Sequence, residues 1–382
     1  METGMFKRRN VLMLIGGGSV LAAGSVGGFV LANGPSSEAR RPWREAGRYA
    51  DFRKRALSYA LLAPNPHNLQ PWKVALVGDN ALTFYPDPDR RLPATDPFDR
   101  QITIGCGAFL ELLRLAAAEE GYAAEIDLFP EGSDMSSLAS APIAHVRFLP
   151  GQASSDPLFA QVLKRRSNKE VYAQKDVEPE KLGALVQAGT TYGQRVGATG
   201  NTPLAAKLRE LTWQAHKLEV TTDYTNQESV DLMRIGAREV RENPDGIELE
   251  GPMIAAGKLL GMVNRDSLAD PTSAGFQQGL AMYEAMAMSA RGFLWLSNDD
   301  ISRQDQINAG RAYVRLNLKA TELGLGIHPW SQSLQEYPEM AELYEEVHAL
   351  IGEGKRLQML VRVGYAPDVI ATPRRGLNAH LV

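Results

Sequence analysis

Residues 63–72 read Ala63-Pro64-Asn65-Pro66-His67-Asn68-Leu69-Gln70-Pro71-Trp72 and follow an apolar stretch at 56–62 that predicts a helix. Proline fixes φ and lacks a backbone donor, so three prolines in ten residues predict a rigid, irregular loop. The side-chain amides of such a loop are free to face outward, and the loop can wrap a planar polar ligand. An ordinary turn before a strand is the alternative interpretation of this pattern.

The loop resembles the Pro-Ser-Ser-x-Asn-x-Gln-Pro-Trp loop of the FMN-dependent nitroreductase family, and its His-Asn pair is similar to that of the single-chain, Acg-type branch. Five positions match the family loop: Pro64, Asn68, Gln70, Pro71 and Trp72. Asn65 and Pro66 replace two serines, so hydroxyl contacts to the flavin are not expected. The resemblance implies an α+β nitroreductase-like fold and bound FMN. It also implies flavin contacts from five loop residues: Pro64, Asn65, Pro66, Asn68 and Gln70.

A second segment, Arg165-Arg166-Ser167-Asn168-Lys169, resembles the family's Arg-x-Ser-x-Lys/Arg segment. A guanidinium fork and a serine hydroxyl can hydrogen-bond the FMN phosphate, which carries close to two negative charges. The resemblance implies that Arg165 and Ser167 bind this phosphate, with Arg166 beside them in the cofactor site. Lys169 would lie near the pyrimidine end of the ring, where a cation stabilises the reduced flavin. A solvated basic helix end is the alternative.

Two segments nearer the C-terminus complete the implied cofactor site. Arg374 and Arg375 follow a predicted strand at 357–363, where the family has basic residues that reach the same phosphate, and the sequence does not decide between them. Pro329, Trp330 and Ser331 fall in the segment whose backbone runs beside flavin N5 in the family. The usual Glu-Gly pair is replaced here by Trp330-Ser331, which predicts more restricted access to N5.

Two long helices, predicted at 102–120 and 307–323, align without gaps at an offset of 203 residues. Six of the fifteen positions from Gly107 to Gly121 are identical to their partners, which include Gly310 and Gly324. The alignment predicts two fused repeats that form a pseudo-dimer. A chance match between two helices rich in Leu and Ala is the alternative.

The repeats are predicted at 43–152 and 153–382, with a helical, lid-like insert at about 213–275 in the second. The family resemblance then implies one FMN between the halves. The second site is predicted to be lost, because residues 189–193 lack a Pro-Trp pair and residues 40–44 are at best a decayed arginine segment.

Residues 1–42 predict an export signal and a linker. Lys7-Arg8-Arg9 precede Val11 to Ala32, 22 residues without a charge, and the Arg8-Arg9 pair resembles a twin-arginine signal. We therefore expect the twin-arginine (Tat) export machinery as a partner, and a location in the periplasm or on the outer face of the cytoplasmic membrane. An uncleaved membrane anchor is the alternative, because 22 apolar residues can just span a bilayer.

Composition narrows the chemistry. A net charge of -4 gives no electrostatic reason to expect nucleic acid as a partner, and the single cysteine, Cys106, excludes an internal disulfide and multi-cysteine metal sites. The position of Cys106 near the start of an apolar helix predicts a buried thiol. No metal site and no catalytic acid, base or nucleophile is predicted. His67 and His328 are candidates to converge at the flavin, with structural hydrogen bonding as the alternative.

These features favour a monomeric FMN oxidoreductase that passes a hydride or electrons from a small-molecule donor to a small planar acceptor, such as a nitroaromatic or a quinone. The alternative function is flavin binding or sequestration with little turnover. An exported globular protein without flavin is the third interpretation.

Overall fold

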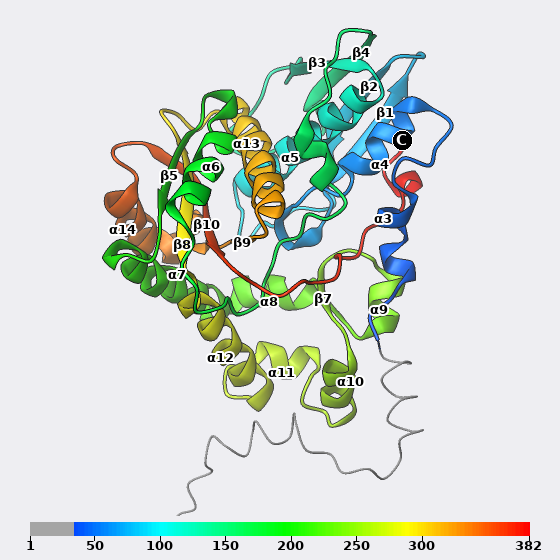
Figure 1. The fold of residues 1–382 in the computed structure, drawn as a ribbon. Helices are drawn as coiled ribbons and strands as arrows, with labels where there is room; N and C mark the ends of the chain where they lie inside the picture. The colour runs from blue at the N-terminus through cyan, green and yellow to red at the C-terminus, as the bar shows by residue number, and fades with distance from the viewer. Residues whose placement is uncertain (1–33) are drawn as a thin grey trace, which may run out of the picture.

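The computed structural model describes residues 34–382 (Figure 1). The predicted twin-arginine signal lies outside the described residues. Two halves with the same order of helices and strands make up the body of the structure. Each half has a helix that leads into a two-strand hairpin or its equivalent, then a long central helix, and then two more strands.

The first half contains one four-stranded antiparallel sheet in the order β1-β2-β4-β3. Its elements are α3 Arg41–Glu45, α4 Phe52–Ala60, β1 Trp72–Val77, β2 Ala81–Pro86, α5 Arg100–Glu119, β3 Tyr122–Leu128 and β4 Ala144–Pro150. Helix α4 begins at Asp51, whose side chain accepts a hydrogen bond from the Arg53 N–H, as a good N-cap does. The turn residues Gly78-Asp79-Asn80 between two short apolar runs predict a hairpin at 73–85. This hairpin and the helix predicted at 102–120 agree with β1, β2 and α5 to within a few residues.

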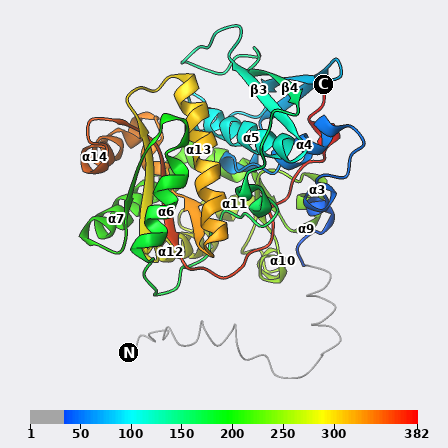
Figure 2. The ribbon, with the colours of Figure 1, turned by 45° about the horizontal axis from the view of Figure 1, so that its top comes forward.

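The second half contains a four-stranded antiparallel sheet in the order β5-β8-β10-β9. Its elements are α6 Pro179–Gly189, β5 Arg195–Thr199, β8 Gly292–Asn298, α13 Arg303–Glu322, β9 Gly326–Pro329 and β10 Arg356–Gly364, with α14 Ala341–Ile351 between β9 and β10. In both sheets the order is therefore first, second, fourth and third strand of the half. Figure 2 shows α13 between α6 and α5 at the junction of the halves.

Helices α5 and α13 contact each other through two glycines. A Cβ on Gly107 would lie 2.0 Å from the carbonyl oxygen of Ile307, and one on Gly310 would lie 1.8 Å from that of Ile104. Both Gly107 and Gly310, and Ile104 and Ile307, are 203 residues apart. The contact is therefore reciprocal, like an isologous contact between two subunits, and the sequence offset describes a real relation between the halves.

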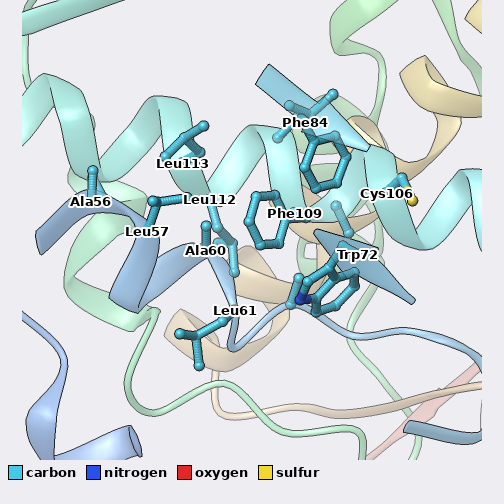
Figure 3. Packing of buried hydrophobic residues seen from close by; sticks show 14 of the residues in the cluster. Ala56, Leu57, Ala60, Leu61, Trp72, Phe84, Cys106, Phe109, Leu112 and Leu113 are labelled. Carbon is cyan, nitrogen blue, oxygen red and sulfur yellow. The ribbon is translucent and has the colours of Figure 1, made fainter. Parts of the chain in front are cut away.

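The core of the first half lies between α4, α5 and the sheet (Figure 3). Trp72 is fully buried beside Phe109, whose ring stacks on Phe84 at 4.6 Å. Cys106 is also fully buried, as predicted, and burial raises the pKa of its thiol. Of the described helices, only α5 is long and apolar enough to cross a bilayer, and it is packed as a core helix.

The second half differs from the first by a long insert, residues 200–291, between β5 and β8. The first half makes the same connection with the tight turn at 78–80. The insert contains α7 Pro203–Thr221, α8 Asp223–Asp231, β6 Met233–Ile235, α9 Ala237–Glu242, β7 Ile247–Leu249, α10 Pro252–Leu259, α11 Arg265–Ala269 and α12 Ala274–Met288. The predicted limits of the insert, 213 and 275, fall inside α7 and α12. Strands β5 and β8 were not predicted from the sequence.

The 3-10 helix η3, Pro157–Gln161, contacts both long helices, α5 and α13. After β10 the chain returns to the first half, where Val74 bonds with His380 and Val382 (Figure 1, red). The segment that carries Arg374 therefore lies against the first half, next to residues 63–72.

Candidate functional site

The loop at 63–72 has an unusual backbone. His67, Asn68 and Gln70 have φ values of 47°, 54° and 54°, in the left-handed region that side chains other than Gly rarely adopt. The loop packs on the start of α5, where a Cβ on Gly105 would lie 3.1 Å from Cβ of Asn65. Three such residues in four positions form a rigid, strained loop, and strain of this kind is concentrated at functional sites.

Two amide side chains of the loop bind the protein itself. Asn65 Oδ1 accepts the Gln70 N–H at 2.8 Å. The Gln70 side-chain amide donates to the carbonyls of Asn68 and Pro244, and its Oε1 accepts the Arg375 N–H at 2.8 Å. Gln70 is fully buried, so it holds the loop in shape. The flavin contact expected of Gln70 stays a prediction.

Three arginines gather around Trp43. The guanidinium carbons of Arg165, Arg166 and Arg374 lie 6.0, 4.6 and 5.7 Å from the centre of its ring. Arg165 and Arg374 are only 2% and 3% exposed, and both donate to the carbonyl oxygen of Leu62, at 3.0 and 3.2 Å. Within residues 34–382, no carboxylate oxygen lies within 4.0 Å of a nitrogen of these three side chains. We call these three residues the arginine cluster.

The electrostatics of the arginine cluster favour an anionic ligand. Burial, and then the neighbouring Arg166, lower the pKa of Arg165 to about 10, while burial and the charge of Arg165 lower the pKa of Arg374 to about 9. Nε and Nη1 of Arg165 and Nε of Arg166 are buried and have no hydrogen-bond partner among residues 34–382. Buried cations with free donors are costly unless an anion binds them. A phosphate group would supply both the charge and the acceptors.

Arg374 and Arg375 have different places, which the sequence did not distinguish. Arg374 donates to the carbonyls of Leu61, Leu62 and Ala63 at the end of α4, and to Oδ1 of Asn68. It therefore ties the C-terminal segment to the loop while it adds its charge to the arginine cluster. Arg375 lies on the other side of the loop and donates to the carbonyl oxygen of Gln70 at 2.6 Å.

Ser167 lies beside the arginine cluster, in hydrogen-bonding range of the Tyr313 hydroxyl on α13. Burial raises the pKa of Tyr313 to about 12, so its hydroxyl stays protonated. Sequence reasoning missed both Tyr313 and the role of Trp43. Trp43 stands inside the decayed arginine segment at 40–44, and an aromatic residue among three arginines was the available signal.

The positive charge of Lys169 acts on both candidate histidines, His67 and His328. Burial lowers the pKa of His67 to about 4, and the charge of Lys169 acts in the same direction. Burial, Arg362 and Lys169 together lower the pKa of His328 well below its ordinary value. Both imidazoles are therefore neutral near pH 7. Arg362 Nε donates to Nδ1 of His328 at 3.3 Å, so Nε2 of His328 carries the proton and can donate it.

The segment that follows β9 is bonded within the protein. Trp330 is 1% exposed, its backbone N–H donates to Leu360 at 2.8 Å, and its indole N–H donates to Thr212 at 3.1 Å. The Ser331 hydroxyl both donates to and accepts from the backbone of Leu360. Pro329 ends β9 opposite Val361. Sheet pairing and interior packing thus engage the Trp330 and Ser331 side chains, and the flavin contacts expected of this segment stay a prediction.

The insert packs directly on the loop. The Gly246 N–H donates to the carbonyl oxygen of Asn68 at 3.2 Å. The neighbouring Asp245 is 5% exposed and pairs with Arg90 at 2.7 Å and with Arg234 at 2.8 Å. Arg90 belongs to the first half and Arg234 to the insert, so this carboxylate fastens one to the other. Residues 245–247 belong to the insert that is predicted from the sequence to be lid-like.

Two known proteins are similar in sequence to this chain over most of its length. No family model matches the chain. The chain is 30% identical over 338 residues to a Mycobacterium tuberculosis protein named as an NAD(P)H nitroreductase, acg, with 86% of this chain and 94% of the relative covered. It is 27% identical over 344 residues to a second M. tuberculosis protein named in the same way, Rv3131, with 86% and 90% covered.

Among solved structures, the FMN-dependent nitroreductase NfnB of Mycobacterium smegmatis, in complex with NADPH, is 20% identical, with 57% of this chain and 94% of that chain covered and a TM-score of 0.36. The match to the acg protein spans most of both chains. The chain therefore belongs to the nitroreductase family, in its Acg-type branch.

Proposed function

We propose that this protein is an FMN-dependent oxidoreductase of nitroreductase type, with one FMN between the two halves of a pseudo-dimer. The names of its relatives support a nicotinamide donor and a nitro compound as the acceptor. We include a quinone as the other small planar acceptor in the proposal. The observation that carries the proposal is the arginine cluster. Arg165 and Arg374 are buried, Arg165 and Arg166 have buried nitrogens without a hydrogen-bond partner among residues 34–382, and no carboxylate of these residues pairs with the cluster. Export by the twin-arginine route is part of the proposal and rests on the sequence of residues 1–42.

The residues of the site fit FMN at two ends. Arg165 and Arg166 would bind the phosphate through their free nitrogens, with Ser167 beside them, while Arg374 would hold the loop against the same site. Lys169 would place a positive charge near the ring. Bound FMN accepts a hydride or electrons and passes them on. The protein contributes orientation and charge, and the Nε2–H of His328 is a donor available for hydrogen bonding or proton supply.

The test is the visible spectrum and the FMN content of the purified protein, followed by Arg165→Gln. Losing a charge-assisted, buried contact to phosphate is expected to weaken FMN binding by about 10- to 100-fold. Arg44→Gln is the matched control, because Arg44 is exposed and contacts only the carbonyl of Ser37. A colourless wild-type protein that does not take up added FMN contradicts the proposal.

Flavin sequestration with little turnover is the second candidate. It is favoured by the engaged Trp330 and Ser331 groups and by the contact of the insert with Asn68, which together predict restricted access to the ring. Anaerobic mixing of the FMN-loaded protein with NADH or NADPH separates the two functions. Rapid bleaching of the flavin band supports the reductase, and a stable band with these and with quinol donors supports sequestration.

A further inference from the structure

Helix α10 and the turn after it form an exposed apolar surface on the insert. Met253, Leu259 and Leu260 are 70%, 80% and 73% exposed, and Met262 is 43% exposed. No residue of α10 is buried. We call these four residues the α10 patch. Soluble surfaces rarely expose adjacent large apolar side chains in this way, so such a patch indicates a partner or a membrane.

The first described residues of the chain are fastened beside this patch. The Ser36 N–H donates to Glu250 Oε2 at 3.0 Å, and Arg40 pairs with Glu250 Oε1 at 2.6 Å. Glu250 stands two residues before the start of α10. Ala32, the last residue of the uncharged stretch, comes four residues before Ser36 in the sequence. Four residues of fully extended backbone reach at most about 14 Å.

We propose that the α10 patch rests on a lipid bilayer, on the same membrane that the uncharged stretch at 11–32 enters during export. An amphipathic surface helix inserts its apolar side chains to the level of the headgroups and keeps its charges outside. Lys258, the one charged residue of α10, fits this arrangement because its ammonium group turns back to the carbonyl of Ile235 and to Glu239. The leucines are left free to enter the lipid.

This placement has a consequence for the electron donor. The insert that carries the α10 patch also contacts the loop, through the Gly246 N–H to Asn68 and through Asp245 to Arg90. A patch seated on lipid would therefore hold the candidate site close to the membrane, where lipid-soluble carriers such as quinols dissolve. The membrane contact itself does not depend on flavin binding, so the two proposals fail separately.

The single buried cysteine allows a clean test on the full chain. Cys106 is fully buried, so a cysteine introduced by Leu260→Cys is the reactive thiol for an environment-sensitive NBD label. Val77→Cys is the matched control, since Val77 is 49% exposed at the end of β1. Figure 1 shows β1 at the opposite end of the molecule from α10. Each labelled variant is mixed with vesicles of phosphatidylethanolamine and phosphatidylglycerol.

We expect the label at 260 to shift its emission to the blue, and to be quenched by nitroxide lipids at least about twofold more than the label at 77. Met253→Cys is expected to give the same result, and it covers the case in which the Leu260 variant does not fold. Equal quenching of both labels by aqueous iodide overturns the proposal. A label at 260 that is shielded without lipid, in proportion to protein concentration, also overturns it and indicates a second copy of the chain.

Discussion

Two regions beside the α5–α13 pair each contain three arginines but have opposite electrostatics. One is the arginine cluster at the loop. The other, which we call the glutamate cluster, surrounds Glu111, whose side chain is completely buried and pairs with Arg114, Arg311 and Arg315 at 2.7, 3.4 and 3.0 Å. Asp156 adds a second carboxylate, 2.7 Å from Arg315.

The two regions occupy related places in the two halves. The loop at 63–72 lies between α4 and β1, and residues 190–194 lie between α6 and β5. Tyr192 has a φ of 67°, as His67 has a left-handed φ in the first loop. The Tyr192 hydroxyl donates to Glu111 at 2.6 Å, and Arg311 covers its ring at 3.7 Å. Protein side chains thus fill the second region.

The pKa values of the arginines show what this difference means. Burial lowers the pKa of Arg165 and Arg374, and no carboxylate outweighs it. Burial also acts on Arg114 and Arg315, but the carboxylates of Glu111 and Asp156 outweigh it and raise the pKa of both. The glutamate cluster is therefore neutralised from within, whereas the arginine cluster needs an anion from outside. We expect one FMN per chain.

The largest effect is expected from Glu111→Gln, which makes the glutamate cluster resemble the arginine cluster. Removing one partner of a buried ion pair leaves uncompensated charge and costs about 3–5 kcal/mol. The measurement is the free energy of unfolding from urea titration.

Glu125→Gln is the control for that substitution. Glu125 pairs with Arg147 on the sheet surface, where both side chains are more than half exposed, and such pairs contribute less than about 1 kcal/mol. If Glu111→Gln costs no more than the control, the glutamate cluster is not the compensated ion network described above, and the contrast between the two regions fails.

A smaller effect is expected at the glycines that hold the two regions in register. Gly107→Ala and Gly310→Ala each place a Cβ on a backbone carbonyl of the opposite helix, and overpacking of this kind costs about 1–3 kcal/mol. The reciprocal contact predicts similar losses for the two variants. Gly183→Ala on α6 is the matched control, since among residues 34–382 nothing beyond its chain neighbours and the backbone of its own helix lies within 4 Å of its added Cβ, and the helix gains from alanine. Strongly unequal losses at 107 and 310 contradict a symmetric contact.

Many helices and strands were predictable because local sequence patterns determine them. The long helices, the hairpin around residues 78–80 and the terminal strand follow from apolar periodicity and turn residues. The repeat was visible because glycines at 107 and 310 are needed for close helix contact. Strands β5 and β8 were missed, since they are short or apolar throughout and stand beside a long helical insert. Their pairing is set by the sheet and not by their own sequences.

The candidate site was predictable as a meeting of segments and less so in its detail. The loop, Arg165 and Arg374 do converge, although they are far apart in the sequence. The sequence did not predict that the side chains of Gln70 and Trp330 hydrogen-bond within the protein. Those bonds depend on partners in the insert, the carbonyl groups of Pro244 and Thr212. Trp43 was passed over because its aromatic ring acts only once three distant arginines surround it.

The smallest effect is expected from pH, and it distinguishes His67 from its counterpart Tyr192. Folding lowers the pKa of His67 from 6.5 to about 4, so the unfolded chain binds a proton first as the pH falls. His67 therefore costs stability progressively between about pH 6.5 and pH 4, and the cost vanishes above that window. The full shift corresponds to roughly 3 kcal/mol, which solvent screening of this partly exposed residue reduces to about 1 kcal/mol.

The variant His67→Gln removes this titration. The free energies of unfolding of the variant and the wild type, measured without flavin, are expected to keep a constant difference above pH 7 and to diverge in favour of the variant below pH 6. Lys169→Gln is the companion variant, because without the nearby positive charge the pKa of His67 rises and the divergence shrinks. Parallel profiles down to pH 4 would mean that His67 takes up its proton as readily in the folded chain as in the unfolded one. In that case the buried, cationic surroundings assigned to the loop would be wrong.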